Sequence, residues 1–253
     1  MKLPPFGFVC VHERPLAAGI ACEAEWMAAA ARGERAVAHL WQGTPGWVAP
    51  RRSAALPAWA AVAARHGSAL QLRASGGGLV PQGPGIWNLS LAWPAADATP
   101  ADMHALYAAL CETLAAAFAR LGVEATPQPV QGSFCDGRWN LAVAGRKLAG
   151  TAQAWRRFGA RQAVLAHALI IVSADPAALT DRANDLEAEL GQGRPYRADA
   201  LTSLAHEAPV IANLEARTLQ ALAEQFARVV PPRIAKEKED GSARVRDGPA
   251  RPG

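Results

Sequence analysis

Residues 73–91 read RASGGGLVPQGPGIWNLSL, a run of glycines followed by a strongly patterned segment. From Ile86 to Trp93 the residues alternate in a way that predicts a β-strand. Asn88 and Ser90 share one face of this strand. Large apolar residues form the other face: Trp87, Leu89, Leu91 and Trp93. We expect the apolar face to pack in the core and the polar face to be available for lining a polar site.

Three consecutive glycines, Gly76, Gly77 and Gly78, belong to the stretch 73–78 that follows a predicted strand. Glycines let a backbone approach a ligand closely, and successive amides can form an anion-binding nest. The same residues can also form a flexible connection. No Gly-Lys-Ser/Thr follows and the G-x-G-x-x-G spacing is absent, so the stretch is neither a phosphate loop nor a dinucleotide fingerprint.

The rest of the chain alternates irregularly between predicted helices and strands, with no internal repeat. Apolar periodicity, caps and proline or glycine stops predict helices over residues 16–31, 56–66, 100–121, 175–191 and 213–229. Apolar runs predict strands over residues 139–144, 147–155 and 162–172, the first two forming a hairpin around Gly145. The expected fold class is α+β, a mixed sheet with helices packed mainly on one face.

Composition limits the class of protein. The net charge of the 253 residues is +4, and residues 231–253 contribute +2 of it. We therefore expect one catalytic domain over residues 1–230, followed by a disordered charged tail over 231–253. No dense basic stripe remains for nucleic acid. The apolar run near residue 1 is too short for the pattern of a signal peptide or a membrane span, and four scattered cysteines form no zinc motif. These features predict a cytoplasmic protein with reduced thiols and no metal, nucleic-acid or membrane partner.

A second stretch, GSFCDGRWNLAVAGRKLAGTAQ over residues 132–153, raises the question of what Cys135 does. Free cysteines are often buried packing residues, and that is one interpretation. The other is a nucleophile, since glycines flank Cys135 and the cations Arg138, Arg146 and Lys147 follow. Its base would have to come from the fold, and Lys147 and His167 are the candidates. His167 lies in an apolar strand and can equally be a core histidine.

Together, RASGGGLVPQGPGIWNLSL and GRKLAGTAQ (145–153) resemble motifs of the lipoate-protein ligase and octanoyltransferase superfamily, whose catalytic domain is related to that of biotin protein ligase. The resemblance covers most of residues 15–230 and implies that fold. It also implies an acyl site for lipoate or octanoate. Besides the catalytic candidates Cys135 and Lys147, the acyl-site candidates it assigns are Arg73, Gly76, Gly77, Gly78, Asn88, Gly150 and His167.

The family has an ATP-dependent ligase branch and a cysteine-dependent transferase branch. Gly132-Ser133-Phe134-Cys135-Asp136-Gly137 is similar to the GSxCxG motif of one transferase subgroup. Ligases usually carry a histidine where this chain has Gln82, a second arginine where it has Ala74, and often an extra C-terminal domain. A His-Gly pair common in the family is His167-Ala168 here. These differences favour the transferase branch.

Three hypotheses follow from the resemblance. The first is an octanoyl or lipoyl transferase that forms a thioester on Cys135, with Leu79, Ile86 and Leu148 as walls of the acyl slot. The second is a lipoate-protein ligase, which needs ATP and Mg²⁺. The third is an inactive member that only binds lipoate or carriers. The implied partners are lipoyl-carrier domains, such as the glycine-cleavage carrier protein or the 2-oxoacid dehydrogenase E2, or acyl carrier protein.

Overall fold

The computed structural model describes residues 3–4, 6, 9–33, 36–95, 100–227 and 233–234. Within the predicted tail, Arg233–Ile234 forms a short strand, β11, that pairs with β1 (Val9–Arg14) in parallel. The rest of the predicted tail lies outside the described residues. No described helix is long and apolar enough to cross a membrane.

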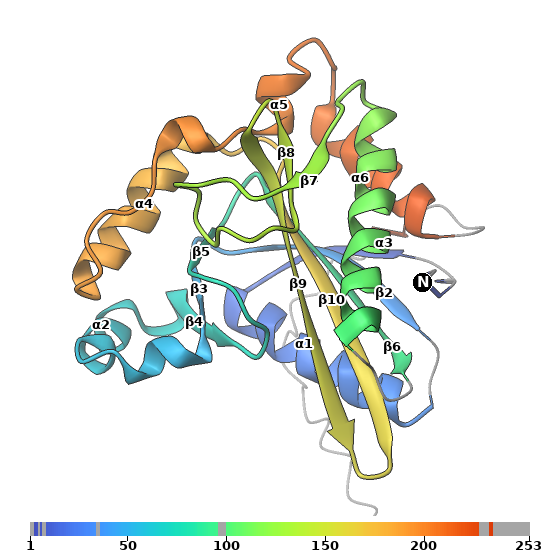
Figure 1. Ribbon diagram of the computed structural model, residues 1–253, viewed down its shortest axis with the longest axis horizontal. Coiled ribbons are helices and arrows are strands. Elements are labelled where there is room, and N and C mark those ends of the chain that lie inside the picture. Colours follow the sequence, from blue (N-terminus) through green and yellow to red (C-terminus); the bar gives the residue numbers. More distant parts are fainter. Residues whose placement is uncertain are drawn as a thin grey trace, which may run out of the picture.

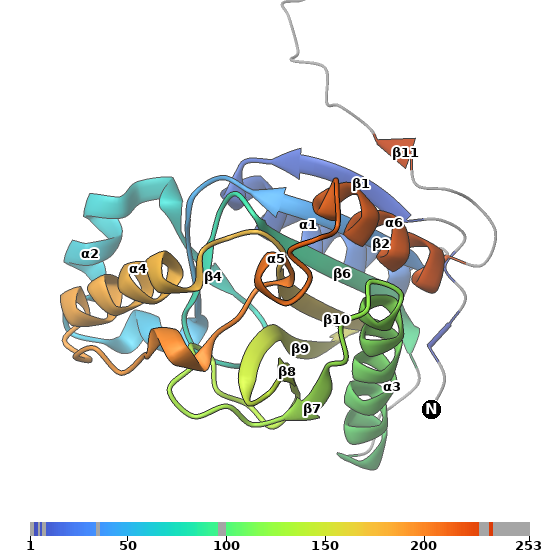
Figure 2. The ribbon, with the colours of Figure 1, turned by 90° about the horizontal axis from the view of Figure 1, so that it is seen from above.

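The centre of the fold is a mixed sheet with the strand order β11-β1-β2-β6-β10-β9-β8-β7, which can be followed from β11 to β7 in Figure 2, and Figure 1 shows its long strands β9 and β10. Its strands after β1 are β2 (Val37–Gly43), β6 (Ile86–Ala95), β7 (Thr126–Gln128), β8 (Asn140–Val143), β9 (Arg146–Phe158) and β10 (Arg161–Ile171). The pairs β1 with β2 and β1 with β11 are parallel, whereas every pair along the order β2-β6-β10-β9-β8-β7 is antiparallel. The sheet is mixed, as expected from the sequence.

Helices cover both faces of this sheet. On one face, α3 (Pro100–Ala119) and α6 (Leu214–Phe226) lie side by side, and their apolar residues share the main core with Trp87, Leu89 and Leu91 of β6 (Figures 1 and 2). On the other face lies α1 (Leu16–Ala31), which packs Met27 against β10. The expectation of helices mainly on one face is thereby refined, because β6 and β10 are buried on both faces.

A smaller sheet stands beside the first, with the order β4-β3-β5. Its strands are β3 (Gly46–Pro50), β4 (Leu70–Arg73) and β5 (Val80–Gln82). The helices near it are α2 (Trp59–His66) and α4 (Pro176–Glu189), which occupy one end of the molecule (Figure 2). The short α5 (Leu204–Glu207) precedes α6. The run of three glycines lies in the connection between β4 and β5. The small sheet therefore fixes the position of both ends of this glycine loop.

The helix predictions agree with the structure, within three residues at each end. The predicted hairpin around Gly145 is also confirmed: Val143 pairs with Arg146, and both turn residues have positive φ, 48° at Ala144 and 77° at Gly145. Two successive residues of that kind make the tight turn whose twist suits antiparallel strands. The short strands β1, β2, β3, β5 and β7 had no prediction.

Candidate active site

Two rows of side chains across the main sheet form the floor of a slot. Trp41 of β2 pairs with Asn88 of β6, Asn88 with Leu169 of β10, and Leu169 with Gly150 of β9. Directly paired residues point to the same face of a sheet. The second row, two residues away on each strand, contains Ser90, His167 and Ala152. The polar face predicted for β6 therefore does face a cavity through Asn88.

The slot above this floor is narrow, with a volume of about 50 Å³. Residues of α1, the small sheet and the cysteine loop cover it, and its apolar lining is Ile20, Trp41, Val48, Val80, Phe134 and Leu169. The predicted walls Leu79, Ile86 and Leu148 are wrong. Each of these three side chains packs in a hydrophobic cluster behind the lining instead.

Cys135 lies at the slot in a constrained turn. Its φ is 52°, a left-handed conformation that is uncommon for any residue other than glycine. The Sγ atom accepts a hydrogen bond from the Gly78 amide at 3.0 Å, and the Nη2 atom of Arg73 lies 4.0 Å away. The sulfur therefore lies between a backbone N–H donor and the positive charge of a guanidinium. The turn presents the sulfur to the glycine loop.

Lys147 supports this turn from below. It is 1% exposed, and its Nζ donates to the carbonyl oxygens of Phe134 at 2.7 Å and Cys135 at 3.1 Å. Burial lowers the Lys147 pKa to about 8, against the attraction of Cys135 and Asp136. Gly150 is needed here, since a β-carbon at that position would lie 2.9 Å from Nζ. Lys147 therefore fixes the cysteine turn and places a titratable amine beneath it.

Arg73 and the glycines close the slot over Cys135. The buried guanidinium of Arg73 donates to the carbonyl oxygens of Gly76 and Gly78, which holds the loop in a tight curve. Gly77 has a φ of 103°, and a β-carbon there would lie 2.5 Å from Cys135 Sγ. The loop thus needs glycine for close approach. Of the two interpretations of the triple glycine, the structure favours close approach over a flexible connection.

His167 is held by partners on both ring nitrogens. Its Nδ1 lies 3.0 Å from the buried carboxylate of Glu23, and its Nε2 lies 2.8 Å from Ser75 Oγ. Burial opposes ionisation of Glu23, but the charge and hydrogen bond of His167, with a further hydrogen bond from Ser90, hold the Glu23 pKa below its ordinary value. Because both nitrogens are engaged, His167 is not positioned as the base for Cys135. Its contacts instead anchor the start of the glycine loop.

Gln82 and Asn88 form a reciprocal amide pair at the slot. Gln82 Nε2 donates to Asn88 Oδ1 at 3.0 Å, and Asn88 Nδ2 donates to Gln82 Oε1 at 2.8 Å. Both side chains are buried, so each satisfies the polar atoms of the other. Gln82, which stands where the resemblance expects a histidine in ligases, is therefore part of the slot wall.

The fold brings most of the predicted site residues together. Those that line the slot are Arg73, Asn88, Cys135, Lys147, Gly150 and His167. Gly77 and Gly78 contact Cys135 from above, whereas a β-carbon at Gly76 would meet nothing within 4 Å. Two cations near Cys135 in sequence have other contacts: Arg146 pairs with Glu207, and Arg138 lies over the Trp139 ring. The described residues include no group of three or more His, Cys, Asp or Glu that could hold a metal ion.

Several lining residues had no prediction, and Glu23 is the most informative of them. Glu23 belongs to the buried stripe of α1, Leu16, Gly19, Glu23, Met27 and Ala30. A carboxylate on an otherwise apolar helical stripe is buried, and a buried carboxylate needs a polar partner. Helical periodicity alone could therefore have identified Glu23 as a candidate site residue. Trp41 and Val48 could not, because their strands had not been identified.

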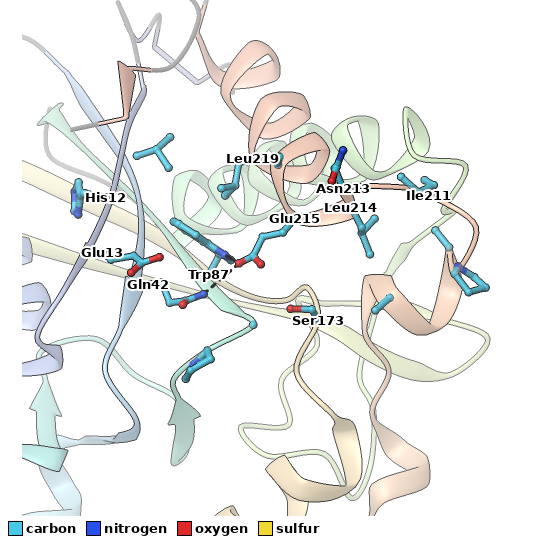
Figure 3. A pocket seen from close by; sticks show the side chains of 17 residues that line it. His12, Glu13, Gln42, Trp87, Ser173, Ile211, Asn213, Leu214, Glu215 and Leu219 are labelled. Carbon is cyan, nitrogen blue, oxygen red and sulfur yellow. Dashed lines mark hydrogen bonds between the residues drawn. The ribbon is translucent and has the colours of Figure 1, made fainter. Parts of the chain in front are cut away.

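Two hollows larger than the slot are formed by other described residues. One, of about 410 Å³, opens to solvent on the outer side of Cys135, and Arg52, Asp136 and Tyr196 contribute to its rim. We call it the outer recess. The other is a larger groove of about 1190 Å³ between α6 and the ends of β1 and β2, where Trp87 Nε1 donates to Glu215 at 2.5 Å (Figure 3). That groove contains none of the predicted site residues.

Comparison with known proteins gives a consistent result. The model of the lipoyl protein ligase A/B catalytic domain matches residues 18–227. An uncharacterized protein of Cupriavidus necator is 48% identical over 190 residues, 69% of this chain and 75% of that protein. An octanoyl-[GcvH]:protein N-octanoyltransferase of Kyrpidia tusciae is 40% identical over 144 residues, which cover 54% of this chain and 49% of that protein.

A solved lipoate-protein ligase A bound with ATP has the same fold, with a TM-score of 0.64 and 15% identity over 92% of this chain and 90% of the ligase.

Proposed function

Because the chain belongs to the lipoyl protein ligase A/B catalytic domain family, an enzyme family of lipoyl and octanoyl transfer, we propose that it transfers an octanoyl or lipoyl group to a lysine of a carrier domain through a thioester on Cys135. The observation that carries the proposal is the position of Cys135. Cys135 lines both the apolar slot and the solvent-open outer recess. An acyl chain held in the slot therefore has its carbonyl beside the sulfur, while the carrier approaches from the recess.

In the first step, the Cys135 thiolate attacks the acyl carbonyl of the donor. The new S–C bond forms, and the bond from the carbonyl carbon to the donor's nitrogen or sulfur breaks. The leaving group takes a proton, and Lys147 Nζ, with its pKa of about 8, is suited to supply it. Backbone amides of the glycine loop stabilise the oxyanion of the tetrahedral intermediate.

In the second step, the amine of the acceptor lysine attacks the thioester carbonyl. An amide forms, the C–S bond breaks, and Cys135 returns to the thiolate, while the acceptor nitrogen loses a proton to the neutral Lys147 amine and restores its ammonium. Donor and acceptor are both carriers that present the group on a long flexible arm. The outer recess, with Asp136 at its rim, is the space through which the acceptor lysine enters; its ammonium loses a proton to solvent before the neutral amine attacks the thioester carbonyl. The relative from Kyrpidia tusciae supports a glycine-cleavage carrier protein as the donor.

The proposal is tested by intact mass. Purified protein is incubated with octanoylated carrier, and its mass is compared for wild type, Cys135→Ala and the control Cys10→Ala. We expect an octanoyl adduct on wild type and Cys10→Ala but none on Cys135→Ala. Hydroxylamine should remove the adduct, and an apo carrier domain should take it up on its lysine.

Three outcomes would contradict the thioester mechanism. Full transfer by Cys135→Ala would return the cysteine to a packing role. Modification of the carrier only when ATP, Mg²⁺ and free lipoate are supplied would identify an ATP-dependent ligase, whose fold this chain shares. Carrier binding without any modification would identify an inactive member of the family.

A further inference from the structure

The slot has a direction, which follows from the strand register. Its floor residues Gly150, Leu169, Asn88 and Trp41 lie on the neighbouring strands β9, β10, β6 and β2. Gly150 is next to Lys147, which holds the Cys135 turn, so the cysteine marks the β9 end. Three strand spacings of about 4.8 Å separate Trp41 from that end, a span of roughly 14 Å. Trp41 is therefore the floor residue farthest from the sulfur.

The Trp41 side chain is held rigidly. It is 1% exposed, and its indole Nε1 donates to Ser90 Oγ at 3.0 Å. The six-membered ring lies against Gly19 of α1 so closely that a β-carbon there would come within 2.3 Å of Cζ3. Packed against helix backbone on one side, the ring cannot withdraw from the slot without moving α1. A buried side chain with a fixed rotamer presents a hard wall to a ligand.

We propose that Trp41 closes the far end of the slot and determines the longest acyl chain that the enzyme accepts. This inference rests on the proposed function in one respect, that the slot holds the acyl chain, and it does not depend on the thioester. A straight chain that starts at Cys135 runs across the sheet, and it gains affinity with each methylene it buries. Binding improves about fourfold per methylene until the chain meets the indole. A chain longer than this does not fit in the slot and binds more weakly.

Two substitutions move the wall in opposite directions. Trp41→Leu removes the ring and deepens the slot, so the preferred chain lengthens by roughly two carbons or more. Gly19→Ala adds a β-carbon against the ring and pushes it into the slot, so the preferred chain becomes shorter. Alanine is also the better helix former, which protects α1 in this variant. Trp47→Leu is the matched control, because Trp47 packs beside α2 outside the slot.

The measurement is calorimetric binding of free hexanoate, octanoate, decanoate, dodecanoate and tetradecanoate to the full chain in a Cys135→Ala background. Circular dichroism and thermal melts select folded variants. We expect one length of tightest binding in the Cys135→Ala protein, a longer one after Trp41→Leu, a shorter one after Gly19→Ala, and no change after Trp47→Leu.

An unchanged preferred length in folded Trp41→Leu and Gly19→Ala proteins would overturn the role of Trp41, and absence of binding to every acid would overturn the slot as an acyl site. A shift of preferred length in a chain whose Cys135→Ala variant retains full transfer would refute the thioester alone.

Discussion

Replacing Gly77 by alanine should uncouple the glycine loop from Cys135 while leaving the fold intact. Gly77 has a φ of 103°, where an L side chain is strained, and its β-carbon would lie 2.5 Å from Cys135 Sγ and 2.8 Å from Arg73 Nη2. The loop must therefore move away from the sulfur. The bond it gives up is the 3.0 Å hydrogen bond from the Gly78 amide to Sγ.

The size of the effect follows from that bond. A hydrogen bond to a charged group contributes about 1.5–3 kcal/mol, so its loss should slow the reactions of Cys135 by at most about tenfold to a hundredfold. Global stability should change little, since the loop is a surface connection between β4 and β5. Gly76→Ala is the control within the same loop, because its β-carbon meets nothing within 4 Å and its φ is not positive.

The assay is the rate of alkylation of Cys135 by iodoacetamide at neutral pH, followed by peptide mass, together with the rate of octanoyl adduct formation. Both rates should fall in Gly77→Ala and stay near wild type in Gly76→Ala. Thermal melts of both variants exclude unfolding as the cause. Equal rates for the two variants, in folded proteins, would refute the argument that the loop must touch the sulfur.

Three further predictions concern other groups. Ser75→Ala removes the hydroxyl that contacts His167 Nε2 and anchors the start of the glycine loop. The variant should form the octanoyl adduct about tenfold more slowly, with the same preferred acyl-chain length. Intact mass at timed intervals after donor is added measures this rate. Because Lys147 is charged only below its pKa of about 8, adduct formation at saturating donor should fall as pH rises through 8, and the Lys147→Met variant should lack that step. Burial lowers the pKa of His12 to about 4 and of His39 to about 3. Below pH 6.5 these histidines bind protons in the unfolded chain but stay neutral in the folded chain. Acidification to pH 5 should therefore lower the free energy of unfolding, measured by urea melts, by about 2 kcal/mol per histidine. The decrease should be smaller in the His39→Gln variant.

The sequence was most informative where one physical rule dominated. Helix α1 was predicted at its observed bounds because its apolar stripe is long and a proline precedes it. The β8–β9 hairpin was predicted because Gly145 marks its turn. By contrast, β1, β2 and β3 are short strands whose buried positions do not alternate regularly. They depend on partners distant in the sequence, which local patterns do not report.

The same division holds within the site. Arg73, Cys135 and Lys147 could be assigned to one site because all three belong to motifs that the resembling family places together. Their contacts could not be predicted, since these depend on how the small sheet lies on the large one. The acyl walls were misassigned for a related reason. Leu148 follows Lys147 on β9 and points to the opposite face of the strand, toward the main core. Leu79 and Ile86 are close to motif residues in sequence, but they pack in clusters with apolar residues of α4 and just after it.

The left-handed turn at Cys135 links these observations. A non-glycine residue at a φ of 52° is strained by about 1–3 kcal/mol, and such strain persists only where surrounding contacts hold it. Here the two hydrogen bonds from Lys147 Nζ to the Phe134 and Cys135 carbonyls provide that hold. An ordinary turn would rotate the sulfur out of contact with the Gly78 amide. The buried lysine therefore has a structural task that exists before any substrate binds, and its removal should impair alkylation of Cys135 as well as acyl transfer.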